Sequence, residues 1–126
     1  MAKVTGLGGI FYKVADPERT RAWYKETFGI GGEWGANFRW SDEPQDDPFS
    51  LVSPFKASSD YFDPSASTFM INFRVDDLEA LIETLSGKGN EVLGTQFEDY
   101  GKFAWILDCD GIKVELWEQI GPAPAA

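Results

Sequence analysis

The sequence predicts an α+β fold in which two tandem βαβββ units form an open, cup-like mixed β-sheet with helices on its outer face. The first observation is an internal repeat, because the order of strand and helix signals over residues 13–29 returns over residues 74–89. The second is a hairpin signal near the end of the chain, Asp110-Gly111 between two apolar runs. One domain over residues 1–126 is expected, divided into unit one at about 4–55, a linker at 56–68, unit two at about 69–119 and a frayed tail at 120–126.

The first unit opens with a strand signal over residues 4–14, where apolar side chains recur at every second position. Asp16 then predicts a helix N-cap, Pro17 the first helical position and Gly29 the end of the helix. Three- and four-residue spacing places five side chains on one face of this helix: Thr20, Trp23, Tyr24, Thr27 and Phe28. Short strands are expected at 33–34, 37–41 and 49–55.

The segment 56–68 is rich in Ser, Asp and Pro, which predicts a loop that joins the two units. Its Tyr61-Phe62 pair is unusually aromatic for a linker. Two interpretations remain open, a hydrophobic tether on the domain surface and a lid across a cleft.

The second unit repeats this plan, with a strand over 69–75 followed by a helix that starts at Asp76-Asp77. A capping box is available from Asp76 to Glu79, and Gly87 and Gly89 end the helix. The helix has a clean apolar stripe: Leu78, Leu81, Ile82 and Leu85. A strand over 91–95 and the two strands of the hairpin complete the unit.

The terminal hairpin predicts where a working site would lie. In the run 112–118, Ile112, Val114 and Leu116 fall on one face, and the opposite face is mixed. That mixed face carries Lys113, Glu115 and Trp117. A strand of this kind separates a core from a cavity, and Glu115 is its central acid.

Composition excludes several classes of function. The net charge of −10 makes nucleic acid an unsuitable partner. Solubility is the simpler explanation of the charge, and attraction of a cationic ligand into an acidic cleft is the alternative. The absence of histidine excludes His-based acid–base and nucleophile chemistry. No apolar run is long enough to span a bilayer, and the single Cys109 fits a reducing compartment, so we expect a cytoplasmic protein without a membrane partner.

The ordered signals of the chain resemble those of the vicinal-oxygen-chelate superfamily, which includes glyoxalase I, bleomycin-resistance proteins, extradiol dioxygenases and fosfomycin-resistance enzymes. The resemblance covers about residues 4–119 and is carried by Val14-x-Asp16, Trp23-Tyr24 before Phe28-Gly29, Val75-Asp76-Asp77-Leu78 and Asp108-x-Asp110-Gly111-x-x-Val114-Glu115-Leu116-Trp117-Glu118. It implies the duplicated fold given above and a homodimer.

The resemblance also implies a divalent metal on the cavity floor of members that do chemistry. The ligand of the terminal strand corresponds to Glu115, but the two first-strand ligand positions correspond to Gly9 and Met70, which cannot bind a hard ion. One carboxylate and water hold a divalent ion only weakly, whereas catalytic sites have three or more protein ligands. We therefore expect no metal cofactor beyond a weak divalent ion at Glu115.

These observations favour a metal-free protein that binds a small, cationic molecule, similar to the bleomycin-resistance branch. The alternatives are a glyoxalase-type lyase or isomerase with Glu115 as general base, and a non-catalytic interaction domain whose cavity is filled. By strand alternation and aromatic content, eight further residues are candidate ligand contacts: Phe11, Lys13, Arg39, Met70, Asn72, Tyr100, Lys113 and Trp117.

Overall fold

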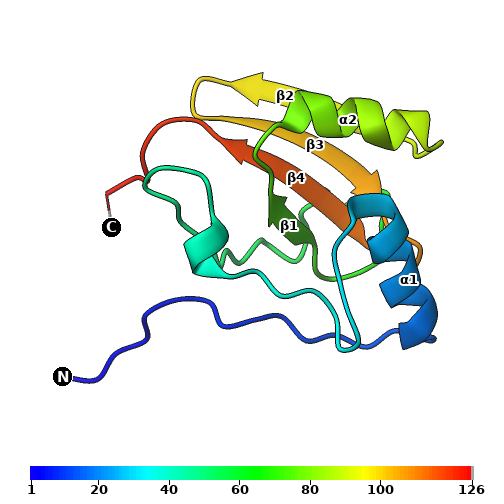
Figure 1. The fold of residues 1–126 in the computed structure, drawn as a ribbon, viewed down its shortest axis with the longest axis horizontal. Coiled ribbons are helices and arrows are strands. Elements are labelled where there is room, and N and C mark those ends of the chain that lie inside the picture. The colour runs from blue at the N-terminus through cyan, green and yellow to red at the C-terminus, as the bar shows by residue number, and fades with distance from the viewer. Residues whose placement is uncertain (126) are drawn as a thin grey trace.

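A computed structural model describes residues 1–125 and contains one four-stranded sheet with two α-helices (Figure 1). The strands are β1 (Ile71–Arg74), β2 (Gly94–Glu98), β3 (Gly101–Leu107) and β4 (Lys113–Gln119). Their order is β1-β4-β3-β2, with β1 parallel to β4 and the other neighbours antiparallel. The predicted α+β class with an open mixed sheet is confirmed.

Both helices cover the same face of this sheet. The core joins Leu78 and Leu85 of α2 (Leu78–Gly87) to the apolar face of β3 and β4, and Trp23 and Phe28 of α1 (Pro17–Phe28) pack against it. The predicted apolar faces of both helices are therefore confirmed. The hairpin contributes four fully buried side chains: Ala104, Ile106, Val114 and Leu116.

Helix α1 begins and ends where the sequence predicts. The Asp16 side chain accepts a hydrogen bond from the backbone N–H of Arg19, and Gly29 takes the left-handed conformation that closes the helix. In α2 the capping residue is Asp77, which accepts from the N–H of Ala80, so the expected capping box from Asp76 to Glu79 is wrong by one residue. Asp77 has the extended backbone conformation of an N-cap residue, so the first turn of the helix begins one residue later than a cap at Asp76 would place it.

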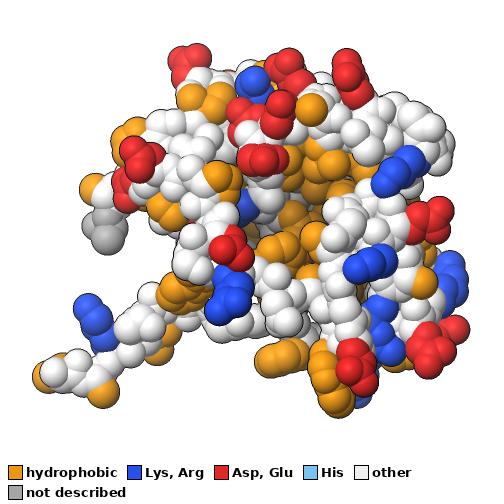
Figure 2. All heavy atoms as spheres, in the orientation of Figure 1, with side chains coloured by type: hydrophobic (Ala, Val, Ile, Leu, Met, Phe, Trp, Pro, Cys, Tyr) orange, Lys and Arg blue, Asp and Glu red, His pale blue; other side chains and the backbone are white. Residues whose placement is uncertain are grey.

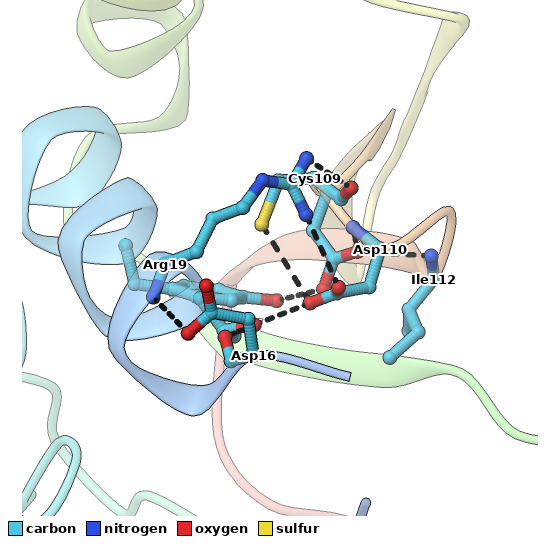
Figure 3. Close-up of polar contacts among 8 residues, drawn as sticks. Asp16, Arg19, Cys109, Asp110 and Ile112 are labelled. Carbon is cyan, nitrogen blue, oxygen red and sulfur yellow. Dashed lines mark hydrogen bonds and ion pairs between the residues drawn. The ribbon is translucent and has the colours of Figure 1, made fainter. Parts of the chain in front are cut away.

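The turn between β3 and β4 anchors α1 (Figure 3). Asp108 accepts a hydrogen bond from the Tyr24 hydroxyl at 2.6 Å, and Asp110 accepts one from the Thr20 hydroxyl at 2.6 Å. Arg19 donates to the carbonyl oxygen of Cys109 and pairs with Asp110. Burial and the carboxylates of Asp110 and Asp108 raise the pKa of the Cys109 thiol, which keeps this cysteine neutral and weakly nucleophilic.

The strands expected in the first unit are not formed, and this part of the prediction is wrong. Within residues 1–125, the segments 4–14, 33–34, 37–41 and 49–55 contain no strand, and Trp40–Asp42 forms a short 3₁₀ helix instead. Alternation indicates which side chains share a face, but a strand also needs a neighbouring edge for its backbone hydrogen bonds. No such neighbour accompanies these segments in the described chain.

Two boundaries in the second half also differ from the prediction. The strand expected at 91–95 begins at Gly94 and continues to Glu98, because it pairs with β3 from Trp105 back to Gly101. The expected frayed tail is partly tethered, since the N–H of Ala123 donates to the carboxylate of Asp47. Ala126 lies outside the described residues.

No helix described within residues 1–125 combines the length and the apolar character needed to cross a bilayer.

Candidate functional site

The face of the sheet opposite the helices has the mixed character that the hairpin predicts. Strand register brings side chains of β1, β3 and β4 together on this face: Asn72, Arg74, Phe103, Trp105, Lys113, Glu115 and Trp117. Glu115 lies in the middle of the group, between Asn72 on one neighbouring strand and Trp105 on the other. We call this surface the mixed face.

The chain's own segment 43–65 lies against the mixed face. The guanidinium of Arg74 forms two hydrogen bonds of 3.1 Å with the carboxylate of Glu43 and lies over the ring of Trp117. This bidentate pair holds the pKa of Glu43 below its usual value. The ring of Phe49 packs edge-on against Trp117, with 5.0 Å between centroids. The first half of the chain therefore covers the site with loops.

Glu115 is the central group of the site and is 8% exposed. Its Oε1 accepts hydrogen bonds from the Tyr61 hydroxyl at 2.5 Å and from the Trp105 indole N–H at 3.0 Å, and its Oε2 accepts one from the Asn72 amide at 2.6 Å. No lysine or arginine of residues 1–125 forms an ion pair with it. Three neutral donors thus form hydrogen bonds with this buried carboxylate, and no cationic side chain of the described residues forms an ion pair with it.

Tyr61 shows how the linker contributes to the site. Burial and the hydrogen bond to Glu115 raise the pKa of its phenol, which keeps the hydroxyl protonated and able to donate. Of the two interpretations of the Tyr61-Phe62 pair, the arrangement fits a lid, because the tyrosine reaches the central carboxylate. The ring of Phe55 packs against the Tyr61 ring, with 5.3 Å between centroids.

Lys113 lies beside this cluster but does not neutralise Glu115. Its ammonium donates to the carbonyl oxygen of Tyr61 at 2.6 Å. It also lies 5.2 Å from the centroid of the Tyr61 ring and 5.5 Å from that of Trp105. The positive charge therefore faces two aromatic surfaces and one carbonyl oxygen.

The donor set of the site does not fit a divalent metal. Two carboxylates are described at the mixed face, Glu115 and Glu43, and that of Glu43 is paired with Arg74. The positions expected to carry the other family ligands, Gly9 and Met70, supply no ligand side chain. Both carboxylate oxygens of Glu115 already accept hydrogen bonds from protein donors. Residues 1–125 contain no group of three or more His, Cys, Asp or Glu side chains close enough to share an ion.

The other candidate residues are spread over the molecule. Asn72, Lys113 and Trp117 lie on the mixed face, as expected. Phe11 is 97% exposed on the N-terminal segment, and Tyr100 is exposed in the turn between β2 and β3. The remaining three lie at element edges: Lys13 before α1, Arg39 before the 3₁₀ helix and Met70 before β1.

Two residues that the sequence did not single out as ligand contacts hold the central acid. Trp105 belongs to the first strand of the hairpin, and alternation within 103–107 places it opposite Glu115. Tyr61 lies far from Glu115 in the sequence, and only its unusual aromatic character within a polar linker marked it. Register could have identified Trp105, but no local pattern identifies a partner contributed by a loop.

Two cavities occur away from Glu115. One of about 570 Å³ lies between residues 13–15, the segment 64–69 and the β3–β4 turn, and Lys13 lines it. The other, of about 390 Å³, lies beside β1, between residues 42–44 and the two helices, with Phe73, Leu81 and Leu116 in its wall. Figure 2 shows hydrophobic side chains gathered in the hollow between α1 and α2.

Comparison with known proteins supports the predicted resemblance. A sequence model of the Glyoxalase/Bleomycin resistance protein/Dioxygenase superfamily matches residues 6–116. No curated protein matches the sequence significantly.

Similar solved structures support the same conclusion for the fold. An integron cassette protein from Vibrio cholerae has a TM-score of 0.57 and 14% identity, covering 94% of this chain and 98% of its own. A glyoxylase/bleomycin resistance protein/dioxygenase domain from Frankia sp. has a TM-score of 0.55 and 17% identity, covering 93% and 99%. At these identities the similarity establishes the fold alone.

Proposed function

The chain belongs to the Glyoxalase/Bleomycin resistance protein/Dioxygenase superfamily, and from this premise we propose that it is a metal-free small-molecule-binding protein whose ligand is a cation held at the mixed face. The proposal rests on the burial of Glu115 and on its lack of an ion-pair partner among the described residues. It is buried, its oxygens are met by neutral donors, and no cation of residues 1–125 pairs with it. A cationic guest on this face would be attracted by the negative potential of the Glu115 carboxylate in a surrounding of low dielectric constant.

Entry of the ligand requires the lid to move. Tyr61 is contributed by the 56–68 segment and is partly exposed, and it is held at Glu115 by one hydrogen bond and by ring contacts. Displacing a loop side chain costs far less than opening a core. We therefore expect the segment around Tyr61 to open for entry and to return to its place once a ligand is bound.

The lyase or isomerase alternative receives less support from the same geometry. A general base must offer a lone pair to the substrate, and hydrogen bonds from protein donors already occupy three of the roughly four lone-pair sites of the Glu115 carboxylate. The third alternative, a non-catalytic interaction domain, rests on the cover that segment 43–65 forms over the mixed face. Binding and turnover measurements separate all three.

The test is a titration with a cationic aromatic dye, thioflavin T, followed by intrinsic tryptophan fluorescence. We expect saturable quenching that weakens as salt increases, since part of the attraction is electrostatic. Glu115→Gln should weaken binding at least tenfold, because the amide keeps the shape of the side chain and removes the charge. Glu91→Gln makes the same charge change at an exposed position and should leave binding unchanged.

The other possible outcomes would contradict the proposal and favour one of the alternatives. Equal binding by Glu115→Gln and the unaltered chain would disprove the assignment of the site. Turnover of a glyoxalase-type hemithioacetal substrate, lost in Glu115→Gln, would establish the enzyme instead. Absence of both binding and turnover would leave the interaction domain. Tight binding of Mg²⁺ or Ni²⁺ in a calorimetric titration would disprove the metal-free site.

We also propose that the working form is a homodimer in a reducing compartment such as the cytoplasm. The first half of the chain exposes many large apolar side chains, among them Phe11, Trp34 and Val52, and its strand-type segments have no neighbour within the described chain. A second copy would cover these surfaces. The single, neutral Cys109 fits a reducing environment.

A further inference from the structure

Lys113 occupies a position that is built for an ammonium group. The rings of Tyr61 and Trp105 stand nearly perpendicular, at 85°, with 6.2 Å between centroids, and form a corner. The Lys113 ammonium lies in this corner, facing both rings, with one hydrogen bond to the Tyr61 carbonyl oxygen. Among the ion pairs of residues 1–125, none involves Lys113. Aromatic faces and a carbonyl oxygen therefore take the place of a carboxylate partner.

The corner is organised by Glu115 rather than by Lys113. Both aromatic residues donate to the same oxygen, Oε1 of Glu115, through the Tyr61 hydroxyl and the Trp105 indole N–H. The rings would therefore keep their mutual arrangement if the lysine side chain left. The buried carboxylate also adds a negative potential close to the corner.

Resting on the proposed function, we propose that the ligand group recognised here is a primary alkylammonium, and that Lys113 is its internal competitor. A protonated primary amine reproduces what the lysine has: two ring faces, one carbonyl acceptor and an aliphatic stem. A quaternary ammonium keeps the ring contacts but cannot donate to the Tyr61 carbonyl oxygen. Ligand and lysine exclude one another, so the apparent affinity is reduced by the fraction of molecules in which Lys113 fills the corner.

The position of Lys113 makes this exchange feasible. Lys113 is the first residue of β4 and is only half-buried, so its flexible side chain can swing out to solvent. A cation–π contact at such a partly exposed site is weak, so the ammonium can exchange between the corner and solvent. An amine must therefore bind the corner more favourably than the Lys113 ammonium does, and amines that bind weakly are excluded.

The experiment compares the binding of n-hexylammonium to the unaltered chain, Lys113→Met and Lys113→Arg. Titrations are followed by the indole N–H signal of Trp105 in ¹H–¹⁵N spectra, assigned with Trp105→Phe. We expect Lys113→Met to bind about threefold to tenfold more tightly, because the competitor is gone and the aliphatic stem is kept. Lys113→Arg should bind no more tightly than the unaltered chain.

A matched control separates the effect of emptying the corner from the effect of removing one positive charge. Lys102 also lies over an aromatic ring, that of Phe97, but it pairs with Glu79 at the helix-covered side. Lys102→Met makes the same charge change and should leave binding as it is. Repeating the titrations in 1 M salt screens simple repulsion, whereas the gain in Lys113→Met should persist if the corner was occupied.

Two results would overturn the competitor role while leaving the proposed function standing. One is equal or weaker hexylammonium binding by Lys113→Met. The other is a gain that disappears in 1 M salt. Tighter binding of hexyltrimethylammonium than of hexylammonium would overturn the primary-amine assignment. If neither the unaltered chain nor Lys113→Met binds hexylammonium or thioflavin T, the proposed function itself fails.

Discussion

The two halves of this chain carry the same order of sequence signals but fold in different ways. The second half, from about residue 69, forms the whole sheet and contributes every member of the buried core cluster. The first half supplies one long helix and a set of loops, and Tyr24 is its one large buried hydrophobic side chain among the described residues. The difference teaches that repeated patterning does not guarantee a repeated structure, because a strand forms only where a partner edge is available.

The first half has a different structural role. Its helix is anchored on the β3–β4 turn by Thr20 and Tyr24, and its loops bring Glu43 and Tyr61 to the mixed face. These contacts are polar and specific, whereas those of the second half are mainly apolar. The stability of the fold is therefore expected to depend on the second half, and the chemistry of the site on both.

A matched pair of leucine truncations gives the most direct test of this contrast. Leu85 of the second half is fully buried, whereas Leu51 of the first half is 59% exposed. Leu85→Ala should lower the free energy of unfolding by about 2–5 kcal/mol, and Leu51→Ala by less than about 0.5 kcal/mol. Urea denaturation followed by circular dichroism measures both. Similar losses would mean that Leu51 is buried, for instance against a second copy.

The oligomeric state gives a second test of the difference between the two halves. If exposed apolar side chains of the first half meet a second copy, Phe11→Ser should weaken dimerisation tenfold or more without lowering the helix content. Analytical ultracentrifugation over a range of concentrations measures this. Phe97→Ser changes an exposed phenylalanine of the second half and serves as the control. A monomeric unaltered chain would refute the dimer outright.

Loss of the hydrogen bond between Tyr24 and Asp108, which joins the two halves, should lower the free energy of unfolding by an intermediate amount. Tyr24→Phe removes the hydrogen bond to the buried Asp108 and should cost about 1.5–3 kcal/mol of unfolding free energy, as for bonds to charged groups. Hydrogen exchange should then increase in α1 more than in α2. An equal increase in both helices would show that the contact stabilises the whole domain instead of docking the first half.

The smallest expected effect is a change of stability with alkaline pH. Burial and the Asp108 hydrogen bond raise the pKa of Tyr24, and burial and the Glu115 hydrogen bond raise that of Tyr61. In the unfolded chain a tyrosine titrates at about pH 10. Above that pH the unfolded state releases protons that the folded state keeps, so stability is complete below about pH 10 and falls as the pH rises further.

A double variant checks this dependence. Tyr24→Phe combined with Tyr61→Phe should show a shallower loss of unfolding free energy between about pH 9 and pH 11 than the unaltered chain. Chemical denaturation at each pH gives the slope. A slope unchanged by the double substitution would show that these phenols titrate normally in the folded protein.

The elements that could be predicted are those whose signals are local. The N-cap at Asp16, the end of α1 at Gly29 and the hairpin around Asp110-Gly111 follow from backbone preferences of the residues themselves. The placement of Glu115 on the mixed face follows from alternation along one strand. Neither kind of inference requires knowledge of distant parts of the chain.

The sequence by itself determined the fold class, the family, both helices, the hairpin and the face on which Glu115 lies, because these depend on residues close together in the chain. Only the tertiary structure decided that the strand-type segments of the first half stay unpaired, that Tyr61 and Trp105 hold the acid, and that Lys113 faces their rings rather than the carboxylate. These outcomes depend on which distant backbone edges and side chains meet, and such meetings are set by packing of the whole molecule.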